Sequence, residues 1–377
     1  MSDLLVGGSE DEEESIVNAT QRLRAAGQSL WLDNITRQLV GSGTLARYIR
    51  ELSITGLTSN PTIFDQAISK SQDYDAAIRD KTKAGRSGEA LFFELAIEDL
   101  TRAADLFGPI HDVTDGVDGW VSLEVSPLLA YDTAKTIAQA KELHARAGRP
   151  NLFIKIPGTP QGLPAIEEAI FAGVPINVTL LFSRGHYVAA ADAYLRGIER
   201  RIAAGLDPDV RSVASIFISR WDKAVAKSVP HELHDRLGIA IAMRAYRAYR
   251  NVLDSDRFQR LANAGARPQR LLFASTGTKD PRASDVLYVG GLAAPLTINT
   301  MPDATLRAFA DHGEVGAPIG ADGGDCEEIL DEFAAAGIDV GELAERLQRE
   351  GAAAFSRSWN ELMDVIVAKS AAAATAA

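Results

Sequence analysis

Short apolar runs rich in β-branched residues recur along this chain and alternate with longer segments whose apolar residues repeat about every 3.6 positions. The first pattern predicts buried strands, and the second predicts amphipathic helices that pack against them. The strand-like runs lie at residues 29–35, 54–60, 119–125, 152–157, 176–182, 210–219, 270–275 and 295–300. Strands that alternate with helices in this way indicate a parallel sheet covered by helices.

Eight buried strands, each followed by helix, predict an α/β fold of the (β/α)₈ or TIM-barrel type, with helices such as 36–52, 133–147 and 183–204 around the barrel. The strands are unevenly spaced, and the longest intervals leave room for additional helices, for example at 88–106 and 231–262. A doubly wound open sheet has similar local patterning and is the alternative. That alternative is weakened because no phosphate-binding GxGxxG pattern follows the first run.

One domain is predicted, because no linker rich in Pro, Gly or Ser divides the chain. We expect the barrel domain with its C-terminal helices to span residues 21–369, with helix over 325–368 that breaks near Gly337. Residues 1–20 include a run of five acidic side chains and are expected to be flexible. The alanine-rich residues 370–377 are expected to form a frayed tail.

Composition narrows the classes of function. The chain carries 39 Lys and Arg against 51 Asp and Glu, a net charge of −12, which argues against general binding to nucleic acid or to an anionic membrane. The single cysteine, Cys326, excludes an intramolecular disulfide and a cysteine-based zinc site. The N-terminus lacks the features of a signal peptide and no stretch is long and apolar enough to cross a membrane, so a cytoplasmic location is predicted. None of the six histidines lies late in a strand, and no metal site is expected.

Lys155 is the most unusual residue of the pattern, because it interrupts the apolar run Leu152-Phe153-Ile154-Lys155-Ile156. Burying an ammonium group is costly, and burial favours the neutral amine. A neutral amine can attack a carbonyl and form a Schiff base. An edge strand with Lys155 facing water is the alternative interpretation.

Other polar residues also fall within or at the ends of the predicted strands. In a barrel, such side chains gather at the C-terminal ends of the strands, where catalytic residues lie. Two of them are carboxylates that can move protons, three suit sugar hydroxyls, and three suit a phosphate group. In that order they are Asp33 and Glu124; Asn60, Asn177 and Ser215; and Arg220, Ser275 and Lys279. With a buried lysine, this set predicts cleavage or formation of a carbon–carbon bond in a ketose phosphate.

Several of these residues also have purely structural interpretations. Asp33 precedes a predicted helix and could be its N-cap. Asn60 could likewise only cap a helix that starts with Pro61. Arg220 and Lys279 could be solvated loop charges, which is the usual state of basic residues. Glu124 has no such alternative, because an unpaired carboxylate within a strand is costly.

These segments together resemble the transaldolase family of Schiff-base enzymes, and the resemblance extends from about Leu30 to the C-terminal helices. Each motif alone is weak, but their combination is highly specific. The motifs are Trp31-Leu32-Asp33, Gly56-Leu57-Thr58-Ser59-Asn60-Pro61, Val121-Ser122-Leu123-Glu124-Val125, Ile154-Lys155-Ile156-Pro157, Ile176-Asn177-Val178-Thr179 and Ser215-Ile216-Phe217-Ile218-Ser219-Arg220. The run Ala274-Ser275-Thr276-Gly277-Thr278-Lys279 is similar to the longer bacterial form of the family.

The resemblance implies a role for each matching residue. Lys155 would form the Schiff base, Asp33 would be the acid/base at the carbon 4 hydroxyl, and Glu124 with Thr179 and a water would transfer protons. The substrate-binding set would be Asn60, Asn177, Ser215 and Phe217 for the sugar, and Arg220, Ser275 and Lys279 for the phosphate. Shorter family members place an arginine soon after the serine that matches Ser275. In this chain Lys279 follows Ser275 by four residues, so at this position the sequence departs from the family pattern.

The implied reaction is that of a transferase in the non-oxidative pentose phosphate pathway. A dihydroxyacetone unit would pass from fructose 6-phosphate or sedoheptulose 7-phosphate to erythrose 4-phosphate or glyceraldehyde 3-phosphate. The protonated imine is the electron sink, so no metal or organic cofactor is expected. A fructose-6-phosphate aldolase is the alternative enzyme, although such members tend to carry Gln and Tyr at the positions of Glu124 and Phe217. A non-catalytic sugar-phosphate binder is the second alternative, and the resemblance is compatible with a monomer or a homodimer.

Overall fold

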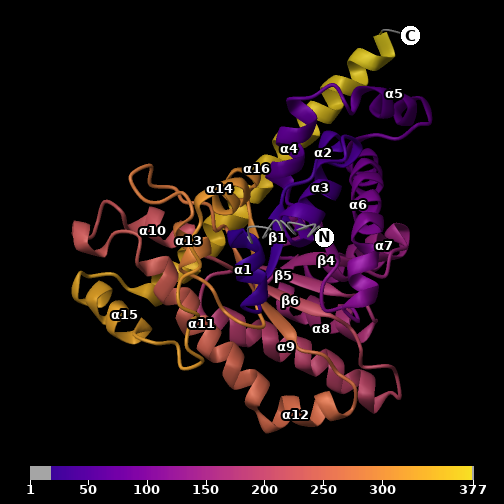
Figure 1. Cartoon of the computed structure of the whole chain (residues 1–377). Coiled ribbons are helices and arrows are strands. Elements are labelled where there is room, and N and C mark those ends of the chain that lie inside the picture. The colour runs from indigo at the N-terminus through magenta and orange to yellow at the C-terminus, as the bar shows by residue number, and fades with distance from the viewer. Residues whose placement is uncertain (1–17, 376–377) are drawn as a thin grey trace, which may run out of the picture.

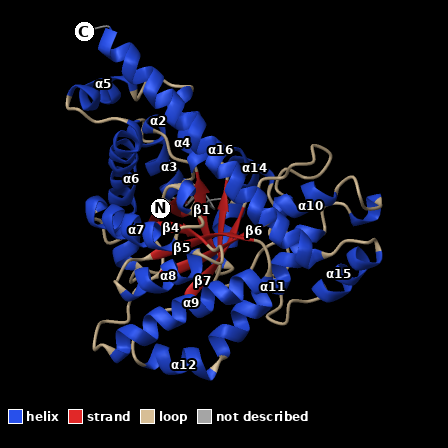
Figure 2. Ribbon diagram, turned by 180° about the vertical axis from the view of Figure 1, so that it is seen from behind, coloured by secondary structure: helices blue, strands red, loops and turns tan. Residues whose placement is uncertain are grey.

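Eight parallel strands close into a barrel at the centre of the molecule, surrounded by helices (Figures 1 and 2). The structure is a computed structural model that describes residues 18–375. Neighbouring strands pair in sequence order, and β1 also pairs with β8, for example Leu30 with Asn299. The strands are β1 Ser29–Asp33, β2 Ile54–Thr58, β3 Trp120–Glu124, β4 Leu152–Pro157, β5 Ile176–Leu181, β6 Ser212–Phe217, β7 Gln269–Ala274 and β8 Ile298–Met301. The predicted barrel is therefore confirmed, and the open sheet is excluded by the pairing of the first strand with the last.

The helices form a ring around the strands, with extra helices in the long intervals between β2 and β3 and between β6 and β7. The first part of the chain contains α1 Ala19–Ala25, α2 Arg37–Gly41, α3 Thr44–Glu51, α4 Pro61–Ser69, α5 Asp75–Lys83, α6 Gly88–Val113, α7 Thr133–Ala147 and α8 Gly162–Phe171. The second part contains α9 Arg184–Ala203, α10 Ser219–Val225, α11 Leu237–Asp254, α12 Asp256–Asn263, α13 Leu287–Gly290, α14 Asp303–His312, α15 Cys326–Ala335 and α16 Val340–Thr375. Short 3₁₀ helices lie at Pro127–Leu129 and His231–Leu233.

One helical prediction is corrected by the structure. The segment 36–52 forms two helices rather than one, because Gly43 adopts a left-handed φ of 77° between α2 and α3. The alanine-rich tail predicted from residue 370 is helical as far as Thr375, where α16 ends, as the high helix propensity of alanine favours. The predicted break near Gly337 is confirmed, since that residue has a φ of 85° between α15 and α16.

The predicted flexible segment 1–20 lies largely outside the described residues, which begin at Asn18. Its last residues already belong to α1. The side chain of Asn18 accepts a hydrogen bond from the Gln21 amide, and the Gln21 side chain bonds back to the Asn18 amide, forming a capping box. The helix therefore begins within the segment that was expected to be flexible.

Most predicted strands extend beyond the observed ones by one to three residues. The predicted run 295–300 shows a physical reason, because Leu296 has a φ of 66° and Pro295 has no backbone donor, so β8 begins only at Ile298. At the end of β6, Ile218 leaves the extended conformation and Ser219 starts α10. Polar residues predicted at these strand ends therefore lie on the loops and first helical turns that follow the strands.

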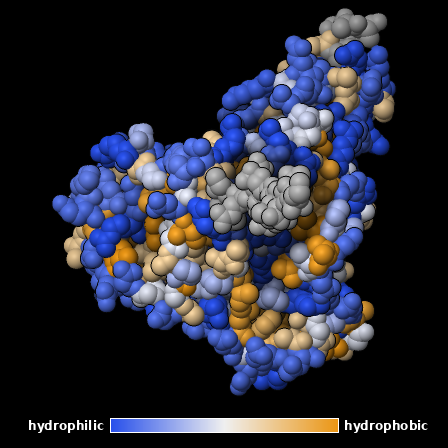
Figure 3. Space-filling model, viewed as in Figure 1, coloured by the Kyte–Doolittle hydropathy of each residue, from blue (hydrophilic) through white to orange (hydrophobic). Residues whose placement is uncertain are grey.

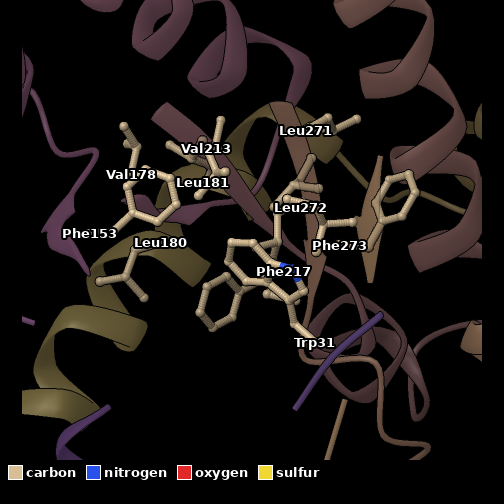
Figure 4. Close-up of a cluster of buried hydrophobic side chains, with 14 of the residues drawn as sticks. Trp31, Phe153, Val178, Leu180, Leu181, Val213, Phe217, Leu271, Leu272 and Phe273 are labelled. Atoms are coloured by element: carbon tan, nitrogen blue, oxygen red, sulfur yellow. The ribbon is translucent and has the colours of Figure 1, made fainter. Parts of the chain in front are cut away.

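Aromatic rings fill the barrel interior toward the N-terminal ends of the strands, which we call its lower end. The rings of Trp120 and Phe153 stack with their centres 4.0 Å apart, and Trp31 lies 6.2 Å from Phe153. A Cβ atom on Gly56 would come within 2.5 Å of the Trp31 ring, so only glycine lets this ring pack against β2. Figure 4 shows Trp31 and Phe153 within the larger cluster of buried apolar side chains from several strands. Trp31, Trp120 and Phe153 form an aromatic floor, which closes the barrel at its lower end.

Helix α16 crosses the opposite, C-terminal end of the barrel and then runs outward beside α4 and α5 (Figure 1). Its Gln348 side chain donates hydrogen bonds to the carbonyl of Gly158, which follows β4, and to that of Leu180, the last residue but one of β5. The face of the molecule in Figure 3 is largely hydrophilic, with scattered apolar residues. None of the helices within residues 18–375 has the length and apolar character needed to cross a membrane.

Candidate active site

A pocket of about 770 Å³ opens at the C-terminal ends of the strands. Most of the side chains singled out from the sequence line it, although they come from five different strands or the segments that follow them. The lining includes Asp33, Asn60, Lys155, Ser215, Phe217, Arg220, Ser275 and Lys279. The predicted clustering of these residues at one end of the barrel is therefore observed.

Lys155 lies in β4, two residues after Phe153 of the aromatic floor, and points into the same interior. Only 4% of the residue is exposed, and a closed barrel leaves no edge strand on which it could face water. Its Nζ atom donates to the Ser59 carbonyl at 3.1 Å and lies 3.3 Å from Glu124 Oε2. The edge-strand interpretation is therefore wrong, and the amine is held between one carbonyl and one carboxylate.

Asp33 is placed at the end of β1, where it is partly exposed to the pocket. Thr58 of β2 donates to Asp33 Oδ1 at 2.7 Å. Burial raises the pKa of Asp33 above its ordinary value, against the opposing effect of the Lys155 charge. The N-cap of α2 is Thr36, whose side chain accepts from the Leu39 amide, so the capping interpretation of Asp33 is wrong.

Glu124 ends β3 opposite Lys155 in the strand register, and it is only 5% exposed. Burial raises the pKa of this carboxyl, again opposed by Lys155. Within residues 18–375 neither carboxylate oxygen has a hydrogen-bond partner of good geometry, and the same holds for the buried Thr179 hydroxyl on β5. Unpartnered buried polar atoms are uncommon and mark sites where a polar partner arrives with a ligand or water. The arrangement can therefore hold or move a proton beside the Lys155 amine.

A chain of amide and hydroxyl groups lies in the barrel interior below the pocket. Ser215 on β6 donates to Asn177 Oδ1 at 2.7 Å, and Asn177 Nδ2 donates to the Ser122 hydroxyl on β3 at 3.1 Å. Ser215 lines the pocket, whereas Asn177 is fully buried and does not. Asn177 therefore orients Ser215 from below, and Ser215 is the member that a ligand in the pocket can reach.

Asn60 has both of the roles that the sequence left open. Its side chain accepts from the Ile63 amide at 3.0 Å and caps α4, with Pro61 at the first helical position. The residue also lines the pocket. The cap uses only its oxygen, so the amide nitrogen can still donate to a hydroxyl group in the pocket.

A cationic region forms one end of the pocket, at the residues that follow β6 and β7. Arg220 is the second residue of α10, and burial lowers the pKa of its guanidinium. Lys279 lies at the rim and is exposed overall, yet desolvation and then the charge of Arg220 lower the pKa of its ammonium group. Ser275, with a φ of 56°, brings its hydroxyl within 3.0 Å of Ser219 Oγ. Two cations beside hydroxyl groups form a region suited to a phosphate, and Arg220 is not a solvated loop charge.

Several residues of the site were missed in the sequence, among them Thr58, Ser122 and Phe355. Thr58 and Ser122 bond to Asp33 and Asn177, and each lies two positions from another interior residue, so the period of the strands could have revealed them. Phe355 of α16 also lines the pocket, and its ring centre lies 5.9 Å from Lys155 Nζ. No local signal marks Phe355, because a phenylalanine on an amphipathic helix reads as an ordinary core residue.

Residues 18–375 contain no group of three or more His, Cys, Asp and Glu side chains placed to hold a metal ion. Cys326 is buried, and it is the free cysteine that the sequence predicted. His231 and His234 lie with their rings 5.1 Å apart on the 3₁₀ helix and the residue that follows it.

Comparison with known proteins gives one consistent result. The family model described as Transaldolase/Fructose-6-phosphate aldolase matches residues 30–366. A transaldolase of Saccharopolyspora erythraea is 45% identical over 353 residues, which cover 92% of this chain and 96% of the relative. A transaldolase of Thermobifida fusca is 45% identical over 93% of this chain and 98% of the relative, and one of Mycolicibacterium smegmatis is 44% identical over 91% and 95%.

Proposed function

This chain belongs to the transaldolase/fructose-6-phosphate aldolase family and is a transaldolase, and we propose that Lys155 performs the reaction by forming an imine with a ketose phosphate. One observation carries this assignment of roles. A buried amine lies 3.3 Å from a buried carboxyl, in a pocket whose lining includes Arg220 and Lys279. A site for binding alone would not need a buried amine, since burial disfavours its charge.

In the first step the neutral Lys155 amine attacks carbon 2 of the ketose. The new C–N bond replaces the carbonyl oxygen, which leaves as water once it has been protonated. Glu124 lies beside the amine and has a raised pKa, so it can deliver that proton. The Thr179 hydroxyl, which is buried and unpartnered among the described residues, would hold a water molecule for the same transfer.

In the second step Asp33 takes the proton from the carbon 4 hydroxyl. The C3–C4 bond breaks, its electron pair moves into the protonated imine, and an aldehyde leaves. The dihydroxyacetone unit remains on Lys155 as an enamine, which attacks the carbonyl carbon of the acceptor aldehyde. Asp33 returns its proton to the new hydroxyl group, and water then hydrolyses the imine, which frees the product ketose and the Lys155 amine. The Thr58 bond to Asp33 Oδ1 leaves the other carboxylate oxygen free for this proton transfer.

The two ends of the pocket support sugar phosphates as the substrates. Fructose 6-phosphate and sedoheptulose 7-phosphate would be the donors, and erythrose 4-phosphate and glyceraldehyde 3-phosphate the acceptors. Arg220, Ser275 and Lys279 would bind the phosphate, and Asn60 and Ser215 would bind hydroxyl groups. We further predict a cytoplasmic location and a monomer or homodimer, which cell fractionation and analytical ultracentrifugation would test.

Borohydride reduction tests the Lys155 assignment directly. With fructose 6-phosphate present, reduction should leave a dihydroxyacetone-derived adduct on Lys155, located by peptide mass spectrometry. If the ligand binds but Lys155 gains no mass, the chain would be a non-catalytic sugar-phosphate binder.

The second candidate activity is that of a fructose-6-phosphate aldolase, which shares the family name. The two activities differ in the fate of the enamine, which either adds to an acceptor aldehyde or is protonated and hydrolysed. Glyceraldehyde 3-phosphate release is measured with and without erythrose 4-phosphate. Release beyond a single turnover should require the acceptor, and equal release over many turnovers in both cases would support the aldolase.

A further inference from the structure

Arg220 is held by aromatic rings rather than by hydrogen bonds. Its guanidinium lies 5.0 Å from the ring centre of Phe217 and 5.7 Å from that of Phe355. Among the described residues it donates no hydrogen bond and forms no ion pair at contact distance, although its pKa is lowered by burial. All of its N–H donors therefore remain available to an anionic ligand, and the two rings determine where the guanidinium lies.

The two rings come from different parts of the fold. Phe217 ends β6, three residues before Arg220, and so moves with the arginine. Phe355 belongs to α16 and is 4% exposed. The position of the guanidinium therefore depends on a contact with a helix that is remote from it in the sequence.

One face of α16 is adapted to this contact. Gln348, Gly351 and Phe355 are spaced by three and four residues, so they share a face of the helix. Gln348 fixes the helix to the Gly158 and Leu180 carbonyls. A Cβ atom on Gly351 would lie 3.1 Å from Arg220 Nη1 and 3.0 Å from Leu180 Cδ2, so the glycine leaves room for the arginine. On the Gln348–Gly351–Phe355 face, Gln348 therefore anchors the helix, Gly351 leaves room for Arg220, and Phe355 lines the pocket.

We propose that Phe355 is a specificity-determining residue for phosphorylated substrates, because it positions Arg220 to bind their phosphate group. The proposal rests on the function proposed above. It adds that recognition of the phosphate depends on α16, whereas formation of the imine at Lys155 does not depend on the Phe355–Arg220 contact. Loss of the ring should therefore weaken binding of phosphorylated ketoses much more than binding of a substrate that lacks phosphate.

Two probes separate these effects. Fructose 6-phosphate with erythrose 4-phosphate gives KM and kcat for a phosphorylated donor. Dihydroxyacetone, trapped on Lys155 by borohydride, gives a half-saturating concentration without any phosphate. Phe355→Leu should raise KM for fructose 6-phosphate about tenfold, the size expected for loss of one cation–π contact. Its half-saturating concentration for dihydroxyacetone should change much less, because the Phe355 ring approaches Lys155 Nζ only to 5.9 Å. Gly351→Ala should shift KM in the same direction while keeping both rings.

Phe92→Leu is the matched control. Phe92 packs edge-on against Trp359 of α16 with ring centres 5.0 Å apart, is buried, and does not line the pocket. The Phe92→Leu variant should loosen the packing of α16 to a similar degree without the selective rise in KM for fructose 6-phosphate. An unchanged KM in Phe355→Leu, an equal loss for both probes, or the same selective loss in Phe92→Leu would each overturn the proposal. If the unmodified chain fails to trap dihydroxyacetone on Lys155, the proposed function fails instead.

Discussion

Two layers of side chains inside the barrel are built by the same three strands and have opposite character. The lower layer consists of Trp31, Trp120 and Phe153, and the upper layer of Asp33, Glu124 and Lys155 on the same faces of β1, β3 and β4. The lower rings pack against one another and contribute to stability, on the order of 1 kcal/mol per aromatic pair. In the upper layer, burial raises the pKa of both carboxyls, so the same surroundings that stabilise the floor make the upper groups reactive.

Replacing the amine should break the upper layer most completely. Lys155→Arg places a guanidinium beside Glu124, and because arginine stays protonated it cannot form an imine. Turnover should fall by roughly a thousandfold or more, while the melting temperature stays close to that of the unmodified chain. Near-normal activity in the coupled assay would disprove the Schiff-base assignment.

The carboxyl groups of the upper layer should determine how kcat/KM depends on pH. Since burial raises the pKa of Asp33 above 3.8, its base form is lost at a higher pH than for an exposed aspartate. As pH falls through this raised pKa, kcat/KM should fall, and Asp33→Asn should lower kcat by about 10²–10⁴-fold and remove that limb. An Asp33→Asn enzyme that keeps the acidic limb would assign the limb to another group, with Glu124 the first to examine.

Removing the cationic end should affect binding more than chemistry. Arg220→Ala should raise KM for fructose 6-phosphate by about 10- to 100-fold, because a charge-assisted interaction is lost, with a smaller change in kcat. Steady-state kinetics with fructose 6-phosphate measures both constants. An unchanged KM would move the phosphate site elsewhere in the pocket.

A change in the floor should give the smallest effect on activity. Phe153→Leu removes the stack on Trp120 and should lower the free energy of unfolding by about 1–3 kcal/mol, measured by urea denaturation. Its kcat should stay close to normal, because Phe153 lies below Lys155 and does not line the pocket. A large loss of kcat with little loss of stability would show that the two layers are not separable.

The barrel and most of the site could be predicted because both depend on local pattern. Alternation within a strand places Lys155 and Phe153 on one face, and the order of strands brings their C-terminal ends together. The start of β8 was harder to predict, because the positive φ of Leu296 leaves no simple trace in an apolar run. The contact of Phe355 with Arg220 was beyond reach, because it depends on how a remote helix docks on the finished barrel.

The position of α16 in the chain has a consequence for synthesis. Every strand, and every group proposed to act on the substrate, precedes Phe355 in the sequence. On a ribosome, the amine, the carboxyls and Arg220 would therefore emerge before the helix that completes their pocket. A nascent chain could close its barrel early while Arg220 still lacks its contact with Phe355. Strong binding of the substrate phosphate would then begin only when α16 docks.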